Sequence, residues 1–304
     1  MQKLLYGKTF GLGNCVMAVP AIKSFADMFG PIDVLIGSTR DDPGAFDVMN
    51  ELRATHGCIN EIFVDRVPLD RTYEYAVMAI PFDGRWQNNV HFCAICTLDG
   101  RPRPGDPTRL GLESWQIHEV EYQMENVFNL GKHLGIENGP VPSMRFAYFE
   151  RECDPDLVYL GIGFKRDTNG FWSKKHWGNE RFARFVREVR RLRPQTNFIS
   201  SAGQADMTVA PDIVRQCGVP IKYGHIRDAF KVIAEAGSYF GNDTGTAHVA
   251  ASFDRPTYMM TAFPGSEVKN SPWCSKWKCN PFHTEVMEPE SVAKDFIDFV
   301  WGQT

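Results

Sequence analysis

The stretch Tyr239-Phe-Gly-Asn-Asp-Thr-Gly-Thr-Ala-His-Val-Ala-Ala251 decides the fold of this chain. Its apolar start predicts a strand, its small polar middle predicts a turn, and its Ala-rich end predicts a helix. Free backbone amides at such a helix start attract anions, and threonine hydroxyls add further donors. Asp and Thr are also common helix caps, so capping by Asp243 explains the same residues equally well. The stretch therefore predicts a strand–turn–helix unit that either binds an anion or only caps a helix.

Short apolar runs alternate with longer amphipathic stretches along the whole chain, which is typical of parallel α/β sheets. A Pro-rich, aperiodic segment at 139–155 interrupts this alternation. We therefore expect two Rossmann-like, doubly wound domains, 1–145 and 146–288, facing a central cleft that holds a ligand. A last helix within 289–304 is expected to pack back on the N-terminal domain. The expected strands are 3–6, 32–36, 59–64, 75–80, 157–163, 197–201, 238–241 and 257–260, and the expected helices are 16–29, 45–55, 115–134, 180–193, 211–217, 228–236 and 289–301.

Composition excludes several classes of protein. The chain has 304 residues, 43% of them hydrophobic, and a formal charge of −4, which is ordinary for a globular enzyme and gives no overall attraction to nucleic acid. No apolar stretch reaches the roughly 18 residues of a transmembrane helix, and the start of the chain lacks the apolar core of a signal peptide. We therefore expect a cytoplasmic protein, in which the 8 Cys are reduced thiols rather than disulfides.

Three segments resemble signatures of glycosyltransferase family 9, the ADP-heptose:lipopolysaccharide heptosyltransferases. Residues 242–251 resemble the family's Asp-[Ser/Thr]-Gly-x-x-His-x-Ala-Ala signature, and residues 172–182 resemble its Lys-x-Trp-Pro-x-x-x-[Phe/Trp] segment. Residues 11–21 resemble its N-terminal Gly-Asp-x-[Leu/Val]-x-x-x-Pro-Ala loop and helix. The resemblance implies a GT-B fold and an inverting, metal-independent transfer of a sugar, with no cofactor besides the nucleotide-diphosphate sugar donor.

The resemblance also implies roles for individual residues. The C-terminal domain holds the donor, where fixed hydrogen-bond donors and a lysine stabilise the charge that develops on the diphosphate leaving group. Lys175 best matches the family's lysine position. Gly11 and Gly13 are expected to let the backbone approach the acceptor closely. The expected diphosphate-binding residues are Asp243, Thr244, Gly245, Thr246, His248, Lys174 and Lys175.

Asn14 occupies the position where the family carries an aspartate thought to deprotonate the acceptor hydroxyl. An amide has no useful basicity, so Asn14 is expected only to orient the acceptor by hydrogen bonding. Three explanations are open: another carboxylate acts as the base, the acceptor needs little deprotonation, or the protein binds its ligands without catalysing transfer. The best substitute is Asp83, directly after a predicted strand, although an Asp-Gly turn explains that residue as well. Glu113 and His118 are weaker candidates.

Other readings of the sequence compete with this one. A catalytically silent nucleotide-sugar-binding protein is the main alternative, because of Asn14. A nicotinamide-dependent dehydrogenase is disfavoured, since no Gly-x-Gly-x-x-Gly follows the first predicted strand. Cys93, Cys96, Cys274 and Cys279 are better explained as buried thiols than as zinc ligands. The acceptor is open among a glycan, a lipid-linked sugar, a protein side chain and a modified nucleic acid, and the sequence does not give the oligomeric state.

Overall fold

The computed structural model describes residues 2–8, 11–36, 44–65, 67–68, 71, 73–79, 90–95, 118–137, 139–149, 152–163, 175–202, 210–282 and 287–302. The chain forms two compact units, Met1–Tyr148 and Phe149–Thr304. The division falls within the Pro-rich segment. Lys23 holds part of that segment on the first unit, because its Nζ donates to the carbonyl oxygens of Ser143 (3.1 Å) and Arg145 (2.6 Å).

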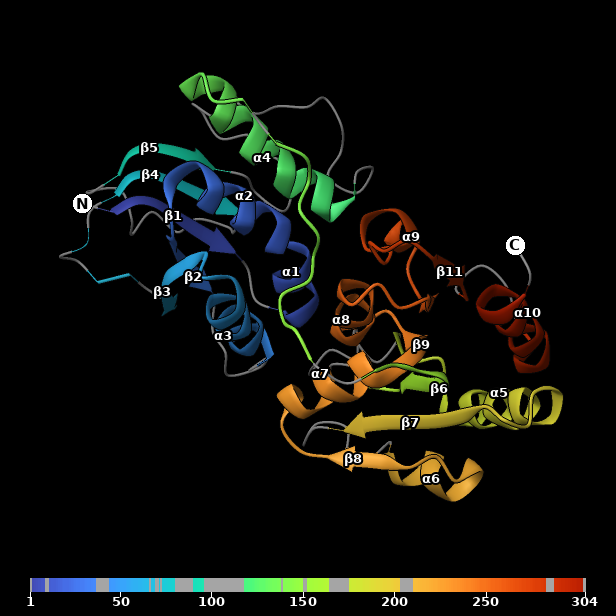
Figure 1. Ribbon diagram of the computed structural model, residues 1–304. Coiled ribbons are helices and arrows are strands. Elements are labelled where there is room, and N and C mark those ends of the chain that lie inside the picture. Colours follow the sequence, from blue (N-terminus) through green and yellow to red (C-terminus); the bar gives the residue numbers. More distant parts are fainter. Residues whose placement is uncertain are drawn as a thin grey trace. The chain divides into compact units, whose positions relative to one another are not determined.

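Among the described residues, five strands form the parallel sheet of the first unit, in the order β3-β2-β1-β4-β5 (Figure 1). Strand order reverses between β1 and β4, which makes the carboxyl ends of these two strands a topological switch point. Helix α2 packs on β1 and β2 and against α4. The elements are β1 (Gln2–Lys8), α1 (Leu12–Met17), α2 (Val19–Phe29), β2 (Ile32–Ile36), α3 (Gly44–His56), β3 (Ile59–Val64), β4 (Tyr73–Ala79), β5 (Val90–Ile95) and α4 (Glu119–Leu134).

The first helical region differs from the single helix expected at 16–29. It consists of two helices that meet at Ala18, and α1 begins at Leu12, so that Gly13 and Asn14 are helical. Pro20 lies in the first turn of α2. Proline has no amide hydrogen and crowds the preceding turn, so one continuous helix cannot pass through it without disruption. Pro20 therefore explains why this region forms two helices rather than one.

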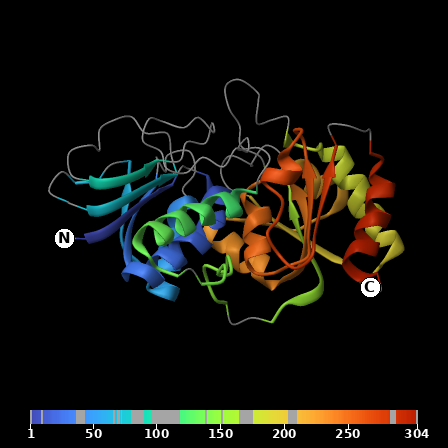
Figure 2. The same ribbon diagram turned by 90° about the horizontal axis from the view of Figure 1, so that it is seen from above.

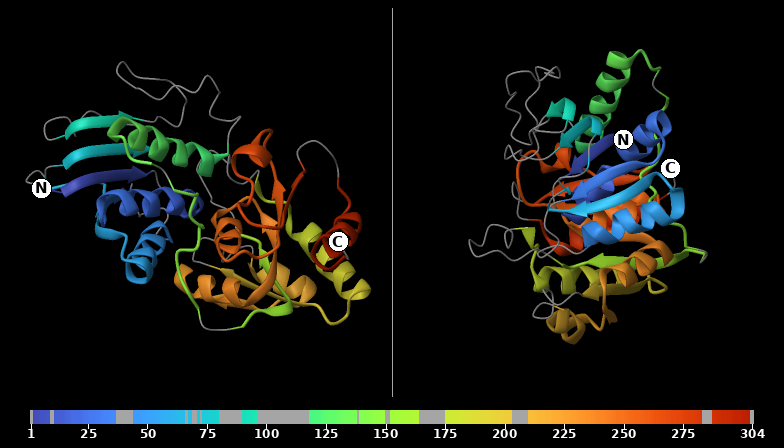
Figure 3. Two further views of the ribbon diagram at one scale, coloured as in Figure 1. Left: turned by 45° about the horizontal axis from the view of Figure 1, so that its top comes forward. Right: turned by 90° about the vertical axis from the view of Figure 1, so that its left-hand side faces the viewer.

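Six described strands form the parallel sheet of the second unit, in the order β11-β10-β9-β6-β7-β8. Helices α5 and α10 pack on each other, with α6 beside α5, on one face of the sheet, and α7 and α8 pack together on the other face (Figures 2 and 3). Strand order reverses between β6 and β9. The elements are β6 (Asp154–Gly161), α5 (Asn179–Leu192), β7 (Asn197–Ala202), α6 (Ala210–Cys217), β8 (Ile221–Tyr223), α7 (Ile226–Glu235), β9 (Ala236–Asn242), α8 (Gly245–Ser252), β10 (Thr257–Thr261), α9 (Ser266–Lys269), β11 (Trp277–Pro281) and α10 (Pro289–Trp301).

The aromatic core of the second unit lies between the sheet and α5 and α10. Phe240 of β9 stacks on Phe185 of α5 with ring centroids 3.7 Å apart, and Phe296 of α10 meets both rings edge-on. Arg184 of α5 also forms ion pairs with Glu288 (2.8 Å) and Glu290 (2.7 Å) at the start of α10. These contacts join α10 to the second unit, and packing of 289–304 against the N-terminal domain stays a prediction. The apolar side of α10 is buried in the second unit because it completes this aromatic core.

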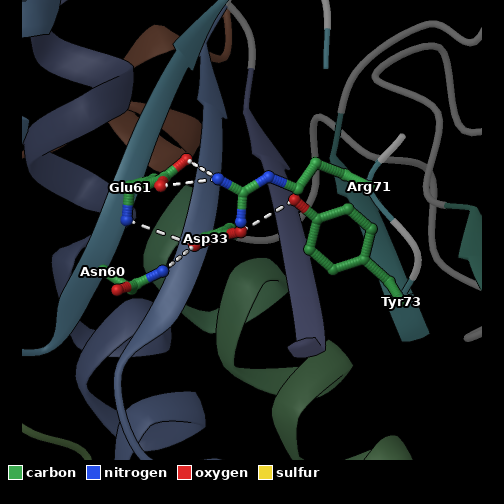
Figure 4. Close-up of polar contacts among 5 residues, drawn as sticks. All are labelled: Asp33, Asn60, Glu61, Arg71 and Tyr73. Carbon is green, nitrogen blue, oxygen red and sulfur yellow. Dashed lines mark hydrogen bonds and ion pairs between the residues drawn. The ribbon is translucent and has the colours of Figure 1, made fainter. Parts of the chain in front are cut away.

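A buried polar network joins three strands of the first unit at their amino-terminal ends (Figure 4). Asp33 of β2 is fully buried. Its carboxylate accepts hydrogen bonds from Asn60 Nδ2 (2.8 Å), the Glu61 amide (3.2 Å) and the Tyr73 hydroxyl (2.8 Å). Arg71 Nη2 in turn donates to both carboxylate oxygens of Glu61, at 2.7 and 2.8 Å. Both carboxylate oxygens of Asp33 therefore accept hydrogen bonds, as a buried carboxylate requires.

Candidate functional site

The sequence-predicted donor residues gather at the carboxyl edge of the second sheet. Strand β9 ends at Asn242, and the neighbouring strand β6 ends at Gly161. This is the point where strand order reverses, and open α/β sheets bind their ligands at such a point. Thr244, Gly245 and Thr246 follow β9 directly and are partly exposed. The predicted strand–turn–helix unit is therefore present, and it lies where a ligand is expected.

Thr244 is the N-cap residue of α8, and its side chain makes no capping hydrogen bond. The Ala247 amide bonds to the Thr244 carbonyl at 3.0 Å. The amides of Gly245 and Thr246 come before Ala247 in the first turn, where an α-helix offers its N–H groups no α-helical acceptor. The Thr244 and Thr246 hydroxyls lie 3.0 Å apart. The turn thus presents amides and hydroxyls together, a combination suited to a phosphate group.

Lys175 and Asp243 form an ion pair beside this turn. Lys175 Nζ lies 2.8 Å from Asp243 Oδ2 and 3.3 Å from the Asp243 carbonyl oxygen. The side chains are only 14% and 4% exposed, so bulk solvent screens the pair weakly. The alternative that Asp243 caps α8 is wrong, because Thr244 holds that position and the Asp243 carboxylate binds the lysine. The Lys175 ammonium group is therefore held next to the turn that was predicted to bind an anion.

Asn242 connects the segments around the ion pair, a role that the sequence analysis missed. Its side chain is fully buried, and its Oδ1 accepts the Trp177 amide at 3.1 Å. Its Nδ2 donates to the carbonyl oxygens of Ile162 (3.2 Å) and Gly163 (3.3 Å). One amide group thus ties the end of β6 and the segment before α5 to the end of β9. The sequence contained one indication of this role, because Asn242 directly precedes Asp243 at the end of a predicted strand.

Two histidines near the turn are largely buried. His248 of α8 is 3% exposed. It was predicted to assist the diphosphate, and it does lie in the helix that begins at the turn. His176 follows Lys175, and its ring packs near that of Phe182, with centroids 5.9 Å apart. Burial lowers the pKa of His176 to about 4, so it is neutral at pH 7. His248 stays the histidine predicted to assist the diphosphate.

Replacing His176 with Phe is expected to make the protein less sensitive to acid. Because the folded-state pKa is about 4 and the ordinary value is 6.5, the unfolded chain takes up a proton first as the pH falls through this interval. The free energy of unfolding of the unchanged protein therefore decreases between these values, by about 2 to 3 kcal/mol. Urea unfolding at several pH values measures this, and parallel pH profiles for the two proteins would contradict it.

In the first unit, the expected acceptor-side residues follow β1. Gly11 has a φ of +107°, a conformation that other residues rarely adopt, and it precedes α1. Gly13 and Asn14 lie in the first turn of α1, and Asn14 is partly buried. Lys174, the proposed base Asp83 and Glu113 lie outside the described residues. His118 is a helix cap, because its Nδ1 accepts the Val120 amide at 3.1 Å.

The cysteines whose side chains are described are thiols rather than disulfides. Cys274 Sγ donates to the Lys276 carbonyl at 3.3 Å, and burial raises the pKa of this thiol to about 12. The side chains of Cys93 and Cys96 lie outside the described residues. Among the side chains that are described, no group of three or more His, Cys, Asp or Glu comes together in a way that would hold a metal ion. None of the described helices combines the length and hydropathy needed to cross a bilayer.

Comparisons with known proteins agree with the fold. A family model described as glycosyltransferase family 9 (heptosyltransferase) matches residues 118–279. A search of curated proteins found no match. Among solved structures, E. coli ADP-heptose lps heptosyltransferase II is 12% identical over 98% of both chains, with a TM-score of 0.67.

Two further structures are similar to the same extent. A family 9 glycosyl transferase from Veillonella parvula is 14% identical over 97% of this chain and 91% of that chain, with a TM-score of 0.68. The E. coli heptosyltransferase WaaC, solved with ADP-2-deoxy-2-fluoro heptose, is 15% identical over 97% of this chain and 99% of that chain, with a TM-score of 0.67. The α/β architecture with two parallel sheets is thus the GT-B fold, as the sequence predicted.

Proposed function

Since this chain belongs to glycosyltransferase family 9, we propose that it transfers a sugar from a nucleotide-diphosphate donor to an acceptor hydroxyl, with inversion and without a divalent cation. The donor sugar we favour is a heptose carried by ADP, because a similar structure holds an ADP-heptose analogue. The second unit binds the donor, and the first unit supplies the acceptor side.

The observation that carries the proposal is the position of Lys175. Its ammonium group lies 2.8 Å from Asp243, the residue before the Thr244–Gly245–Thr246 turn, at the switch point of the second sheet. A diphosphate bound at the turn meets the amides of α8 and this cation together. As the bond between the anomeric carbon and the diphosphate oxygen breaks, negative charge grows on the diphosphate. Fixed donors and a cation aimed at that charge stabilise it, which is the role that a metal ion has in other transferases.

The acceptor side needs a base for inversion. The acceptor oxygen forms its bond to the anomeric carbon on the face opposite the diphosphate, and its proton passes to a carboxylate. Asn14 cannot take that proton. Asp83 follows β4 shortly in the sequence, and β4 pairs with β1, the strand that precedes Asn14. We assign the base to Asp83 on this ground.

Asn14 also favours a second candidate function, a nucleotide-sugar-binding protein that performs no transfer. This protein would keep the donor turn and Lys175 and would lack a base. Both functions require binding of a nucleoside diphosphate. They differ only in whether an acceptor causes its release.

A release assay tests the proposal. The protein is incubated with ADP-heptose or with UDP- and GDP-linked sugars, with and without candidate acceptor glycans, and free nucleoside diphosphate is measured. We expect acceptor-dependent release that persists in EDTA, and a product with the opposite anomeric configuration by NMR. Binding of a donor without release by any acceptor would favour the silent protein. Loss of release in EDTA would overturn the metal-independent mechanism, and no binding of any donor would overturn both functions.

A further inference from the structure

We propose that Tyr239 is a positioning residue for the donor diphosphate, acting through the hydroxyl groups of Thr246 and Thr244. This inference rests on the proposed function, since it concerns how the anion-binding turn is held ready. Tyr239 lies on β9, three residues before the strand ends at Asn242, and is fully buried on the sheet face opposite to the aromatic core. It does not touch the ligand in this proposal.

The hydroxyl of Tyr239 links the strand to the turn. It donates to the Asn242 carbonyl oxygen at 3.2 Å and lies 3.1 Å from Thr246 Oγ1. Thr246 Oγ1 in turn lies 3.0 Å from Thr244 Oγ1. Three hydroxyl groups therefore form a chain that begins inside the second unit and ends at the partly exposed turn.

The phenol keeps its single hydrogen at neutral pH, because burial raises the pKa of Tyr239 to about 12. That hydrogen can go to the Asn242 carbonyl oxygen or to Thr246 Oγ1, and in the contact with Thr246 either hydroxyl can be the donor. In both arrangements the phenol links the end of β9 to the first turn of α8.

The Thr244 hydroxyl lies next to the same groups. Its Oγ1 is 3.0 Å from Thr246 Oγ1 and 3.5 Å from the Asn242 carbonyl oxygen, the second distance being at the limit of a hydrogen bond. Tyr239 thus fixes where the two threonine hydroxyls of the turn lie.

The position of the phenol is fixed from two sides. Gly161 of β6 leaves the space that the Tyr239 hydroxyl occupies, since a methyl group at Gly161 would overlap the phenol oxygen. Gly161 is paired with Gly241, where a side chain would overlap the Gly161 backbone. Tyr159 of β6 stacks on Tyr239 with ring centroids 5.8 Å apart and planes at 16°. A ring held in this way returns to the same place after each turnover.

Tyr159 provides a matched control. It is also a tyrosine, is also buried, and pairs directly with Tyr239 across the two strands. Its hydroxyl bonds instead to Ser201 Oγ on β7. Tyr159→Phe therefore removes a comparable hydroxyl from the same layer and keeps the ring that stacks on Tyr239.

The test is calorimetric titration of ADP and of UDP into the unchanged protein, Tyr239→Phe, Tyr159→Phe, Thr246→Val and the double variant Tyr239→Phe/Thr246→Val. We expect Tyr239→Phe to weaken nucleotide binding about threefold to tenfold, the effect of one lost hydrogen bond, and Tyr159→Phe to leave it unchanged. The double variant is expected to lose less affinity than the sum of the two single losses, because Tyr239 acts in part through Thr246. In the release assay, the KM for the donor should rise more than kcat falls.

The outcomes separate this inference from the proposed function. Wild-type binding of ADP or UDP together with unchanged binding by Tyr239→Phe overturns the inference and leaves the proposed function standing. Additive effects of Tyr239→Phe and Thr246→Val also overturn it, since they show a role that does not pass through Thr246. A lower Tm with unchanged nucleotide affinity identifies a purely structural residue and has the same consequence. If the unchanged protein binds neither nucleotide, both the proposed function and the inference fail.

Discussion

Asp83→Asn is expected to lower the turnover number at least about a hundredfold and to leave donor affinity unchanged. General-base catalysis contributes roughly 10² to 10⁴ in rate, and an amide at this position cannot accept the acceptor proton. Donor affinity is expected to persist because the proposed diphosphate site, Lys175 and the turn after β9, belongs to the other unit. Acceptor-dependent release of nucleoside diphosphate measures the first quantity, and calorimetry measures the second.

A second substitution sharpens this test. Asn14→Asp restores a carboxylate at the family's position, so Asn14→Asp in the Asp83→Asn background is expected to recover part of the turnover. Glu113→Gln serves as the matched control and should behave like the unchanged protein. Normal turnover of Asp83→Asn would show that the base assignment is wrong. Turnover that appears only with Asn14→Asp would instead support the silent nucleotide-sugar-binding protein.

Lys175→Met is expected to weaken binding of ADP roughly tenfold to a hundredfold, the range for a lost hydrogen bond to a charged group. It should also lower the free energy of unfolding by about 3 kcal/mol, because it leaves the Asp243 carboxylate buried without its partner. Asp243 is 4% exposed, so water cannot replace the lysine. Calorimetry with ADP and urea unfolding measure the two losses separately.

The double variant Lys175→Met/Asp243→Asn distinguishes the two effects. Removing both charges should restore most of the stability, since no buried charge is left alone, while ADP binding should stay weak, since no cation meets the diphosphate. Lys222→Met, an exposed lysine on β8 of the same sheet, controls for a change of net charge. ADP binding that recovers together with stability would show that Lys175 only balances Asp243.

The sequence predicted the fold class because both sheets are parallel and buried. The residues of β2 and β10 are buried throughout, so these strands are mostly apolar, with Asp33 in β2 and the terminal threonines of β10 as exceptions, and their bounds were nearly correct. Three strands were missed. Strand β8 has only three residues, two of them exposed, while β11 begins with Trp277, a 45% exposed residue in a Lys-rich segment. Strand β5 follows a long segment without periodicity. Short edge strands carry little hydrophobic pattern, and local sequence could not reveal them.

The sequence identified only those parts of the candidate site that belong to local motifs. Thr244 and Lys175 belong to local motifs, so their residue types and spacing were visible. Lys175 and Asp243 are far apart in the chain, and neither segment contains a pattern that predicts their pairing. Asn242 was overlooked because its contribution depends on the Ile162 and Gly163 carbonyls, which only the arrangement of the strands brings near. Long-range polar contacts were the part that sequence reasoning could not supply.

Asp33 has a consequence for how the first sheet assembles. Apolar residues on both faces of β2 mean that sliding this strand by one position would bury nearly the same surface, so hydrophobic burial alone scarcely selects one alignment. A slip would, however, carry the Asp33 carboxylate away from Asn60 and Tyr73 and leave an ionised group in the interior without donors. Asp33 therefore favours one register of β2 relative to β3 and β4. Its replacement by a residue of similar shape without charge should yield a sheet that forms but misaligns.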